Sequence, residues 1–228
     1  MHTLQTLNEL PKKSYFGKHS VYFPSQKNQR QIVCDSILEA DYCILLEFDS
    51  KVECYNARPG AFNICVNGEA QDYTPDFITE TSESLYYTEV KANFEKLSSR
   101  VKIKLDAASH YFSSMGYSLK FADENTIRKG EILKNLKFLY LHSFNVGKDE
   151  LGDCARQLEA ITYPIRLGDL FAMGNRPSVR STYKAMFDQS LTFDLNKRIT
   201  LNTLIEGRKD GHNHPESWCT VYTGQPSV

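Results

Sequence analysis

The 228-residue sequence has no long hydrophobic run, no Cys-x-x-Cys pair and a formal net charge of only −1. No apolar run approaches the roughly 20 residues that span a bilayer, and the N-terminal stretch lacks the apolar core of a signal peptide. The six cysteines are scattered, which argues against a zinc cluster or a disulfide framework and favours reduced thiols. We therefore expect a cytoplasmic protein that has no membrane partner.

Acidic residues are absent between residues 11 and 34, although the net charge gives no general support for nucleic-acid binding. Basic residues in this gap stand among aromatic ones, an arrangement that suits contact with phosphates. A second basic cluster lies between residues 91 and 104. The two clusters predict DNA-binding residues at Lys12, Lys13, Lys18, Lys27, Arg30, Lys96, Arg100 and Lys104. The alternative is that these side chains form ordinary solvated faces.

An apolar fraction of 41% and a charged fraction of 24% are ordinary for a globular protein, so the chain can bury a sizeable core. Its length favours one domain plus a small second one. We predict an extended basic arm at residues 1–28, a main domain at 29–150, a smaller C-terminal domain at 151–210 and a flexible tail at 211–228. The polar composition between residues 145 and 163 indicates a linker.

The sequence predicts a hairpin of two strands, Tyr73–Ile78 and Leu85–Ala92, joined by a polar turn. Side chains alternate across a strand, so Glu89 and Lys91 point to one face. If the strands pair, Asp76 lies beside Glu89. Two carboxylates and an ammonium on one face are costly to bury unless a metal ion or a charged substrate offsets the charge. The alternative is a surface hairpin that carries unrelated charges.

A helix is expected over residues 29–47, which contain no Gly or Pro and carry apolar residues at helical intervals. Glu39 falls on the same stripe as Ile32 and Cys43. An ionised group on an inward stripe needs a partner, and a metal ion or the hairpin lysine would be one. Alternatively, Glu39 reaches solvent or an arginine at the helix edge. Glu47, at the end of the helix, is the competing candidate.

The fold class predicted by the remaining pattern is α/β. The expected elements are strands at residues 52–55, 61–66 and 117–122, helices at 98–115 and 122–144, and a hairpin turn at Asn67-Gly68. The strands before the hairpin favour an antiparallel meander, and a helix between two strands favours a right-handed crossover. Together these features predict a mixed sheet flanked by helices.

The C-terminal part is expected to hold two short helices at residues 167–173 and 179–187, followed by a strand at 191–195 and a turn. This order suits a small winged-helix-like domain, in which Arg176 and Arg180 are candidates to face DNA. A solvated helix face is the alternative. The two histidines and the cysteine near the C-terminus have poor spacing for zinc and fit a loosely packed tail.

Several motifs, in order, resemble those of a known nuclease superfamily and of one family within it. The motifs are Pro75-Asp76 and Glu89-Val90-Lys91, the helix carrying Glu39 that runs into Leu45–Asp49, the segment Thr74–Phe77, and Thr126–Arg128 before Asn135-Leu136. The first two resemble the signature of PD-(D/E)xK nucleases. All of them together, over about residues 29–144, resemble the TnsA family, the endonuclease subunits of heteromeric cut-and-paste transposases.

The resemblance implies a restriction-endonuclease-like fold with catalytic residues at Glu39, Asp76, Glu89 and Lys91 and metal ligands at Asp76, Glu89, Val90 and Glu39. The implied cofactor is a pair of Mg²⁺ ions, which Mn²⁺ can replace. Such ions activate a water and stabilise the leaving oxygen of a phosphodiester. Lys91 would orient that water and help neutralise the phosphorus centre. Glu89 stands where some members have glutamine, and glutamate is the better cation ligand.

The implied substrate is transposon-end DNA, nicked at the 5′ ends on the strands that are not transferred. The implied partners are a DDE-type transposase similar to TnsB and an AAA+ ATPase regulator similar to TnsC, docked on the C-terminal part. One rival is a free-standing restriction or repair nuclease. The other is a DNA-binding scaffold subunit in which the hairpin charges are structural.

Overall fold

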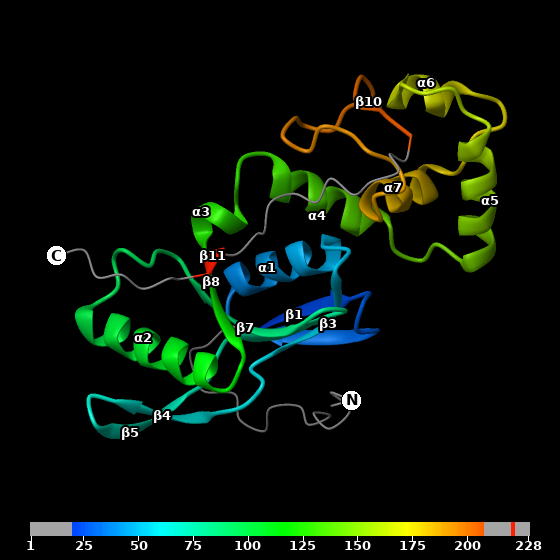
Figure 1. Ribbon diagram of the computed structural model, residues 1–228. Coiled ribbons are helices and arrows are strands. Elements are labelled where there is room, and N and C mark those ends of the chain that lie inside the picture. The colour runs from blue at the N-terminus through cyan, green and yellow to red at the C-terminus, as the bar shows by residue number, and fades with distance from the viewer. Residues whose placement is uncertain (1–19, 208–219, 222–228) are drawn as a thin grey trace. The chain divides into compact units, whose positions relative to one another are not determined.

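The computed structural model describes residues 20–207 and 220–221, which fall into two compact units (Figure 1). Unit 1 contains residues 20–47, 51–126 and 220–221, and unit 2 contains residues 48–50 and 127–207. No helix in the described part of the chain combines the length and the hydropathy needed to cross a membrane.

Unit 1 is built on a mixed sheet with the strand order β11-β8-β7-β6-β3. Its strands are β3 (Val52–Ala57), β6 (Phe77–Thr81), β7 (Leu85–Lys91), β8 (Ser118–Asp123) and the short β11 (Thr220–Val221). Strand β6 runs antiparallel to β3 and β7, whereas β7 and β8 are parallel. Helix α2 (Ser99–Ser114) makes the crossover between the two parallel strands, so the α/β class and the mixed sheet are confirmed.

The two faces of this sheet are covered by different elements (Figure 1). On one face, Tyr87 and Leu119 pack into a core with Leu105 and Phe112 of α2. The hairpin of β4 (Phe62–Val66) and β5 (Glu69–Tyr73) closes the same core, through residues such as Ile64 and Tyr73. On the other face lies α1 (Ile37–Phe48), whose Tyr42 contacts the ring of Phe77 and the hydroxyl of Thr88. The sheet is therefore buried on both sides.

The helix predicted over residues 29–47 is wrong in its first part. Residues 30–34 form strand β2 (Arg30–Cys34), which pairs with β1 (Val21–Ser25) in a separate two-stranded sheet. In β2 the buried residues, Ile32 and Cys34, are two positions apart, which is a strand period. The described end of the predicted N-terminal arm thus forms a hairpin, and α1 begins only at Ile37.

The predicted meander is also wrong, because β3 pairs with β6 and not with β4. The Asn67-Gly68 turn is confirmed: both residues have positive φ angles, 52° and 86°, and they join β4 to β5. Tyr73 consequently ends β5 instead of beginning the next strand. The first strand of the predicted hairpin starts at Phe77, so Thr74–Asp76 form a connection between two sheets.

Unit 2 is mostly helical. Its helices are α4 (Ile132–His142), α5 (Lys148–Glu159), α6 (Leu167–Ala172) and α7 (Val179–Phe187), and a short pair joins β9 (Ile165–Arg166) to β10 (Leu204–Ile205). The single helix predicted at residues 122–144 is interrupted: α3 (Glu124–Ile127) and α4 are separated by Gly130, whose φ is 52°. The two short helices predicted near residues 167 and 179 are confirmed.

Two further predictions for this unit are wrong. The segment predicted as a linker contains α5, which buries Cys154 and Leu158 on one face. The strand predicted at residues 191–195 is absent from the described chain, where Thr192 makes only an isolated bridge to Glu206. All five described cysteines are free thiols, as predicted. The histidines at 212 and 214 and Cys219 lie outside the described residues.

Candidate functional site

Asp76 is held at the point where the ladder between β6 and β7 ends. The last pair in the register is Phe77 with Thr88, so Pro75 would face Val90 if the ladder continued. Proline has no N–H to donate, and the ladder stops there. The Val90 N–H instead donates to Oδ2 of Asp76 at 2.7 Å. This bond fixes the Asp76 carboxylate beside the end of β7, and it explains why a proline precedes the aspartate.

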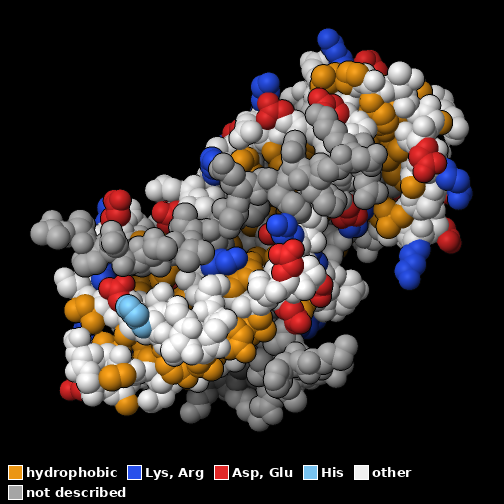
Figure 2. Space-filling view, viewed as in Figure 1, with side chains coloured by type: hydrophobic (Ala, Val, Ile, Leu, Met, Phe, Trp, Pro, Cys, Tyr) orange, Lys and Arg blue, Asp and Glu red, His pale blue; other side chains and the backbone are white. Residues whose placement is uncertain are grey.

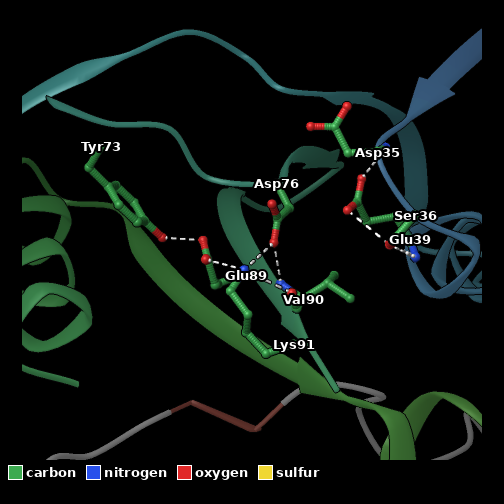
Figure 3. Close-up of polar contacts among 8 residues, drawn as sticks. All are labelled: Asp35, Ser36, Glu39, Tyr73, Asp76, Glu89, Val90 and Lys91. Carbon is green, nitrogen blue, oxygen red and sulfur yellow. Dashed lines mark hydrogen bonds and ion pairs between the residues drawn. The ribbon is translucent and has the colours of Figure 1, made fainter. Parts of the chain in front are cut away.

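Lys91 joins the two acidic residues of the hairpin (Figure 3). Its Nζ lies 2.6 Å from Oε1 of Glu89 and 3.3 Å from Oδ2 of Asp76, and it donates to the Val90 carbonyl at 3.0 Å. The Glu89 side chain is 7% exposed and the Lys91 side chain 33%, so solvent reaches the cluster from the lysine side. The predicted convergence of these three side chains is confirmed, whereas their catalytic role stays a prediction.

The electrostatics of this cluster follow from a buried carboxylate, Glu89, and a half-buried one, Asp76, that share one ammonium. Burial raises the pKa of Glu89, and the charge of Asp76 raises it further, while Lys91 opposes the change. Burial alone would lower the pKa of Lys91, but the carboxylates of Glu89 and Asp76 together raise it. Lys91 therefore keeps its charge and neutralises a pair of acids that would otherwise repel each other.

Tyr73 completes the surroundings of Glu89 from the opposite side. Its hydroxyl donates to Oε2 of Glu89 at 2.6 Å, and burial together with the charge of Glu89 raises the pKa of Tyr73. Tyr73 is thus a neutral donor at the carboxylate oxygen that Lys91 does not touch. The sequence does not indicate this role, because the predicted hairpin places Tyr73 in the same strand as Asp76 and not at the end of β5.

Glu39 is buried, as its position on an inward stripe suggested, but its partners differ from those predicted. Its Oε2 accepts from the Asp35 N–H at 2.8 Å, its Oε1 accepts from the Ser36 hydroxyl at 3.0 Å, and its own N–H donates to Ser36 Oγ at 3.1 Å. These contacts resemble a capping box at the start of α1. Burial raises the pKa of Glu39, and the charge of Asp76 raises it further.

Ser36→Ala removes the hydroxyl that both caps α1 and holds Glu39. We expect the free energy of unfolding to fall by about 1 kcal/mol, the usual value of such a cap. Chemical denaturation at equilibrium measures it. Ser178→Ala is the matched comparison, because Ser178 also caps a helix, α7, and also donates to a glutamate, Glu150. A Ser36 variant with unchanged stability would contradict the capping role.

Glu47, the competing candidate, is part of a separate buried network. Its Oε1 accepts from the hydroxyls of Ser25 and Tyr55, at 2.5 and 2.8 Å, and its Oε2 accepts from the Lys27 N–H at 3.1 Å. These bonds tie the β1–β2 hairpin and β3 to α1. Structural donors satisfy both carboxylates, but Asp76 raises the pKa of Glu39 through its charge, so Glu39 remains the better candidate for the site.

Arg58 also adjoins the site and was not foreseen. Its N–H donates to the Asp76 carbonyl at 2.8 Å, and its Nη1 lies 3.2 Å from Oδ1 of Asp35. Its φ of 51° is a left-handed conformation that non-glycine residues seldom adopt. The signal in the sequence is the position of Arg58 directly before Pro59-Gly60, a pair that marks the end of a strand.

The predicted DNA-binding residues are spread over several elements. Lys12, Lys13 and Lys18 lie outside the described residues. Arg30, Lys96, Arg100 and Arg176 are exposed, whereas Lys27 and Lys104 donate to the carbonyls of Val52 and Asp72, and Arg180 pairs with Glu150. Figure 2 shows basic and acidic side chains intermingled on the visible face. The contact of these residues with DNA stays a prediction.

The oxygen atoms around the Lys91 ammonium are of the kind that bind a hard divalent cation. They are carboxylate oxygens of Asp76 and Glu89 and the main-chain carbonyl of Val90, all of which contact the Lys91 ammonium. Val90 has an apolar side chain, so only its carbonyl can serve as a ligand. Within the described residues, no three His, Cys, Asp or Glu side chains already lie together as a metal site.

Comparison with models of known protein families and with curated proteins finds no match for this chain.

Proposed function

We propose that the chain is a Mg²⁺-dependent DNA endonuclease of the PD-(D/E)xK class, with a restriction-endonuclease-like core in unit 1. Within that class, we infer a TnsA-like subunit of a transposition complex from the motifs described above. The observation that carries the proposal is the meeting of Asp76, Glu89 and Lys91 at one end of β7, with the Val90 carbonyl among them.

Each residue has a definite task in this proposal. Asp76 and Glu89 supply anionic oxygens for Mg²⁺, the Val90 carbonyl supplies a neutral one, and Glu39 is the candidate for an additional ligand. Paired Mg²⁺ ions, for which Mn²⁺ can substitute, would activate the attacking water and stabilise the leaving oxygen. Lys91, released from its ion pairs when a cation arrives, would orient the water and stabilise the charge that develops on the phosphoryl oxygens.

The proposed substrate is transposon-end DNA, cut at the 5′ ends on the non-transferred strands. A TnsB-like DDE transposase would process the 3′ ends, and a TnsC-like AAA+ ATPase would dock on unit 2, which we propose to contain a winged-helix-like domain. The near-zero net charge supports dependence on such partners, because a chain with little excess positive charge gains little non-specific affinity for DNA.

We expect the purified chain, mixed with a transposase and ATPase encoded beside it, to nick plasmids that carry the element ends. Nicking requires Mg²⁺ or Mn²⁺ and is lost when EDTA removes the metal. Primer extension across the nicks identifies the strand. Efficient cutting without partners would favour the free-standing nuclease, and DNA binding without metal-dependent cutting would favour the scaffold.

The affinity for metal should fall in mild acid. Burial and the charge of Asp76 raise the pKa of Glu89, so a proton competes for its carboxylate at a higher pH than it would in water. Above the raised pKa the carboxylate is ionised and binds the cation, and below it the proton displaces the cation. Mn²⁺ binding followed by electron paramagnetic resonance across this range measures the effect. An affinity that rises with acidity would contradict the assignment.

A further inference from the structure

The two carboxylate oxygens of Glu89 have different partners (Figure 3). One partner is a flexible side chain and the other is fixed in the core. Oε1 pairs with the Lys91 ammonium at 2.6 Å, and Oε2 accepts from the Tyr73 hydroxyl at 2.6 Å. Lys91 is one-third exposed and carries its charge on a flexible chain, so it can leave Oε1. Tyr73 is only 5% exposed and has no such freedom.

Tyr73 is held by the aromatic core between α2 and the β4–β5 hairpin. Its ring centroid lies 6.2 Å from that of Phe112, and its strand partner Phe62 lies 4.9 Å from Phe112 and 5.4 Å from Tyr87. Turning Tyr73 away from Glu89 would break this packing. It would also leave the buried Tyr73 hydroxyl without an acceptor. The free-energy cost would be similar to the contribution of a hydrogen bond to a charged group.

On the basis of the proposed metal centre, we propose that Tyr73 is a positioning residue that holds Oε2 of Glu89, so that Glu89 binds a cation through Oε1. Tyr73 thereby makes the site selective for Mg²⁺ over Ca²⁺. An incoming cation replaces Lys91 at Oε1, while Oε2 stays bonded to Tyr73. No covalent step is involved, and Tyr73 does not touch the substrate.

This restriction matters because the two cations use carboxylates differently. Mg²⁺ demands near-octahedral geometry and binds carboxylates through single oxygens, whereas Ca²⁺ takes more ligands and readily accepts both oxygens of one carboxylate. With Oε2 occupied by Tyr73, Glu89 offers the single oxygen that suits Mg²⁺. Bidentate binding of Ca²⁺ would draw Oε2 towards the cation and weaken its bond from the buried Tyr73 hydroxyl, a cost that monodentate Mg²⁺ binding does not carry.

Tyr73→Phe tests the proposal, because the phenylalanine ring keeps the packing against Phe112 and loses only the donor. Tyr87→Phe is the matched control, since it removes a hydroxyl from the same aromatic core without removing the bond to Glu89. Binding of Mn²⁺ to the full-length protein without DNA is followed by electron paramagnetic resonance, and Mg²⁺ and Ca²⁺ are then titrated as competitors. Thermal unfolding of each variant without metal checks the fold.

In Tyr73→Phe we expect the Ca²⁺ affinity to rise relative to that of Mg²⁺ by about tenfold, the value of one hydrogen bond to a charged group. The ratio should stay within about twofold of wild type in Tyr87→Phe. A wild-type ratio in Tyr73→Phe, or an equal rise in both variants, would overturn the role of Tyr73 while leaving the metal centre in place. Failure of all three cations to bind the wild-type protein would overturn the metal centre as well.

Discussion

Asp76→Ala and Lys91→Ala are each expected to abolish Mg²⁺-dependent nicking, with losses of about a thousandfold. Asp76 is anchored by the Val90 N–H beside the Val90 carbonyl, so its replacement removes the anionic oxygen around which the proposed cation site is built. Lys91 contacts both carboxylates, and without it nothing in the hairpin can orient the water or offset charge on the phosphate. The measurement is the nicking rate on element-end DNA with partners present.

The control for both variants is Lys134→Ala, which removes an exposed lysine of α4 that pairs with Glu131, the N-cap residue of that helix. It should nick at the wild-type rate. Far-ultraviolet circular dichroism and co-purification with the partners should show that all three variants fold and assemble. Nicking at the wild-type rate by Asp76→Ala or Lys91→Ala would contradict the catalytic role assigned to that residue.

Glu47→Ala is expected to lower the free energy of unfolding by about 3 kcal/mol. The substitution leaves the hydroxyls of Ser25 and Tyr55 and the Lys27 N–H without their shared acceptor, all of them buried or half-buried. It also removes two of the bonds that join the β1–β2 hairpin to α1, those from Ser25 and Lys27. Equilibrium denaturation with urea measures the loss.

Glu53→Ala, an exposed position on the neighbouring strand β3, is the control and should change stability by less than about 0.5 kcal/mol. The cation affinity of Glu47→Ala, measured under conditions in which the variant is folded, should match that of wild type. A strong loss of cation binding with little loss of stability would exchange the roles assigned to Glu47 and Glu39.

The core of the site could be predicted from the sequence because it depends on local rules. Alternation along one strand places Glu89 and Lys91 on the same face, and strand pairing brings Asp76 to them. The partner of Glu39 could not be predicted in the same way, because the assumed helix began too early. Ser36-x-x-Glu39 is itself a capping pattern, and it would have located the start of α1 correctly.

Other parts of the fold depended on signals that short patterns do not resolve. Strand β2 was read as helix because Ile32 satisfies both a helical and a strand period over so short a run. The sequence of α5 predicts a linker because it is mostly polar and contains Gly152. The helical pattern rests on few apolar residues, such as Cys154 and Leu158, which lie four positions apart. Tyr73 was missed because its meeting with Glu89 requires the β4–β5 hairpin to fold back, which is a tertiary contact.

Anomalous diffraction from crystals grown with Mn²⁺ tests most directly whether Asp76 and Glu89 share a cation. The expected result is a peak bound by oxygens of Asp76 and Glu89 and by the Val90 carbonyl, at Mn²⁺–oxygen distances of about 2.2 Å, with Lys91 displaced from both carboxylates. Mn²⁺ bound only elsewhere, with the Lys91 ion pairs intact, would contradict the proposed metal centre and the nuclease function built on it.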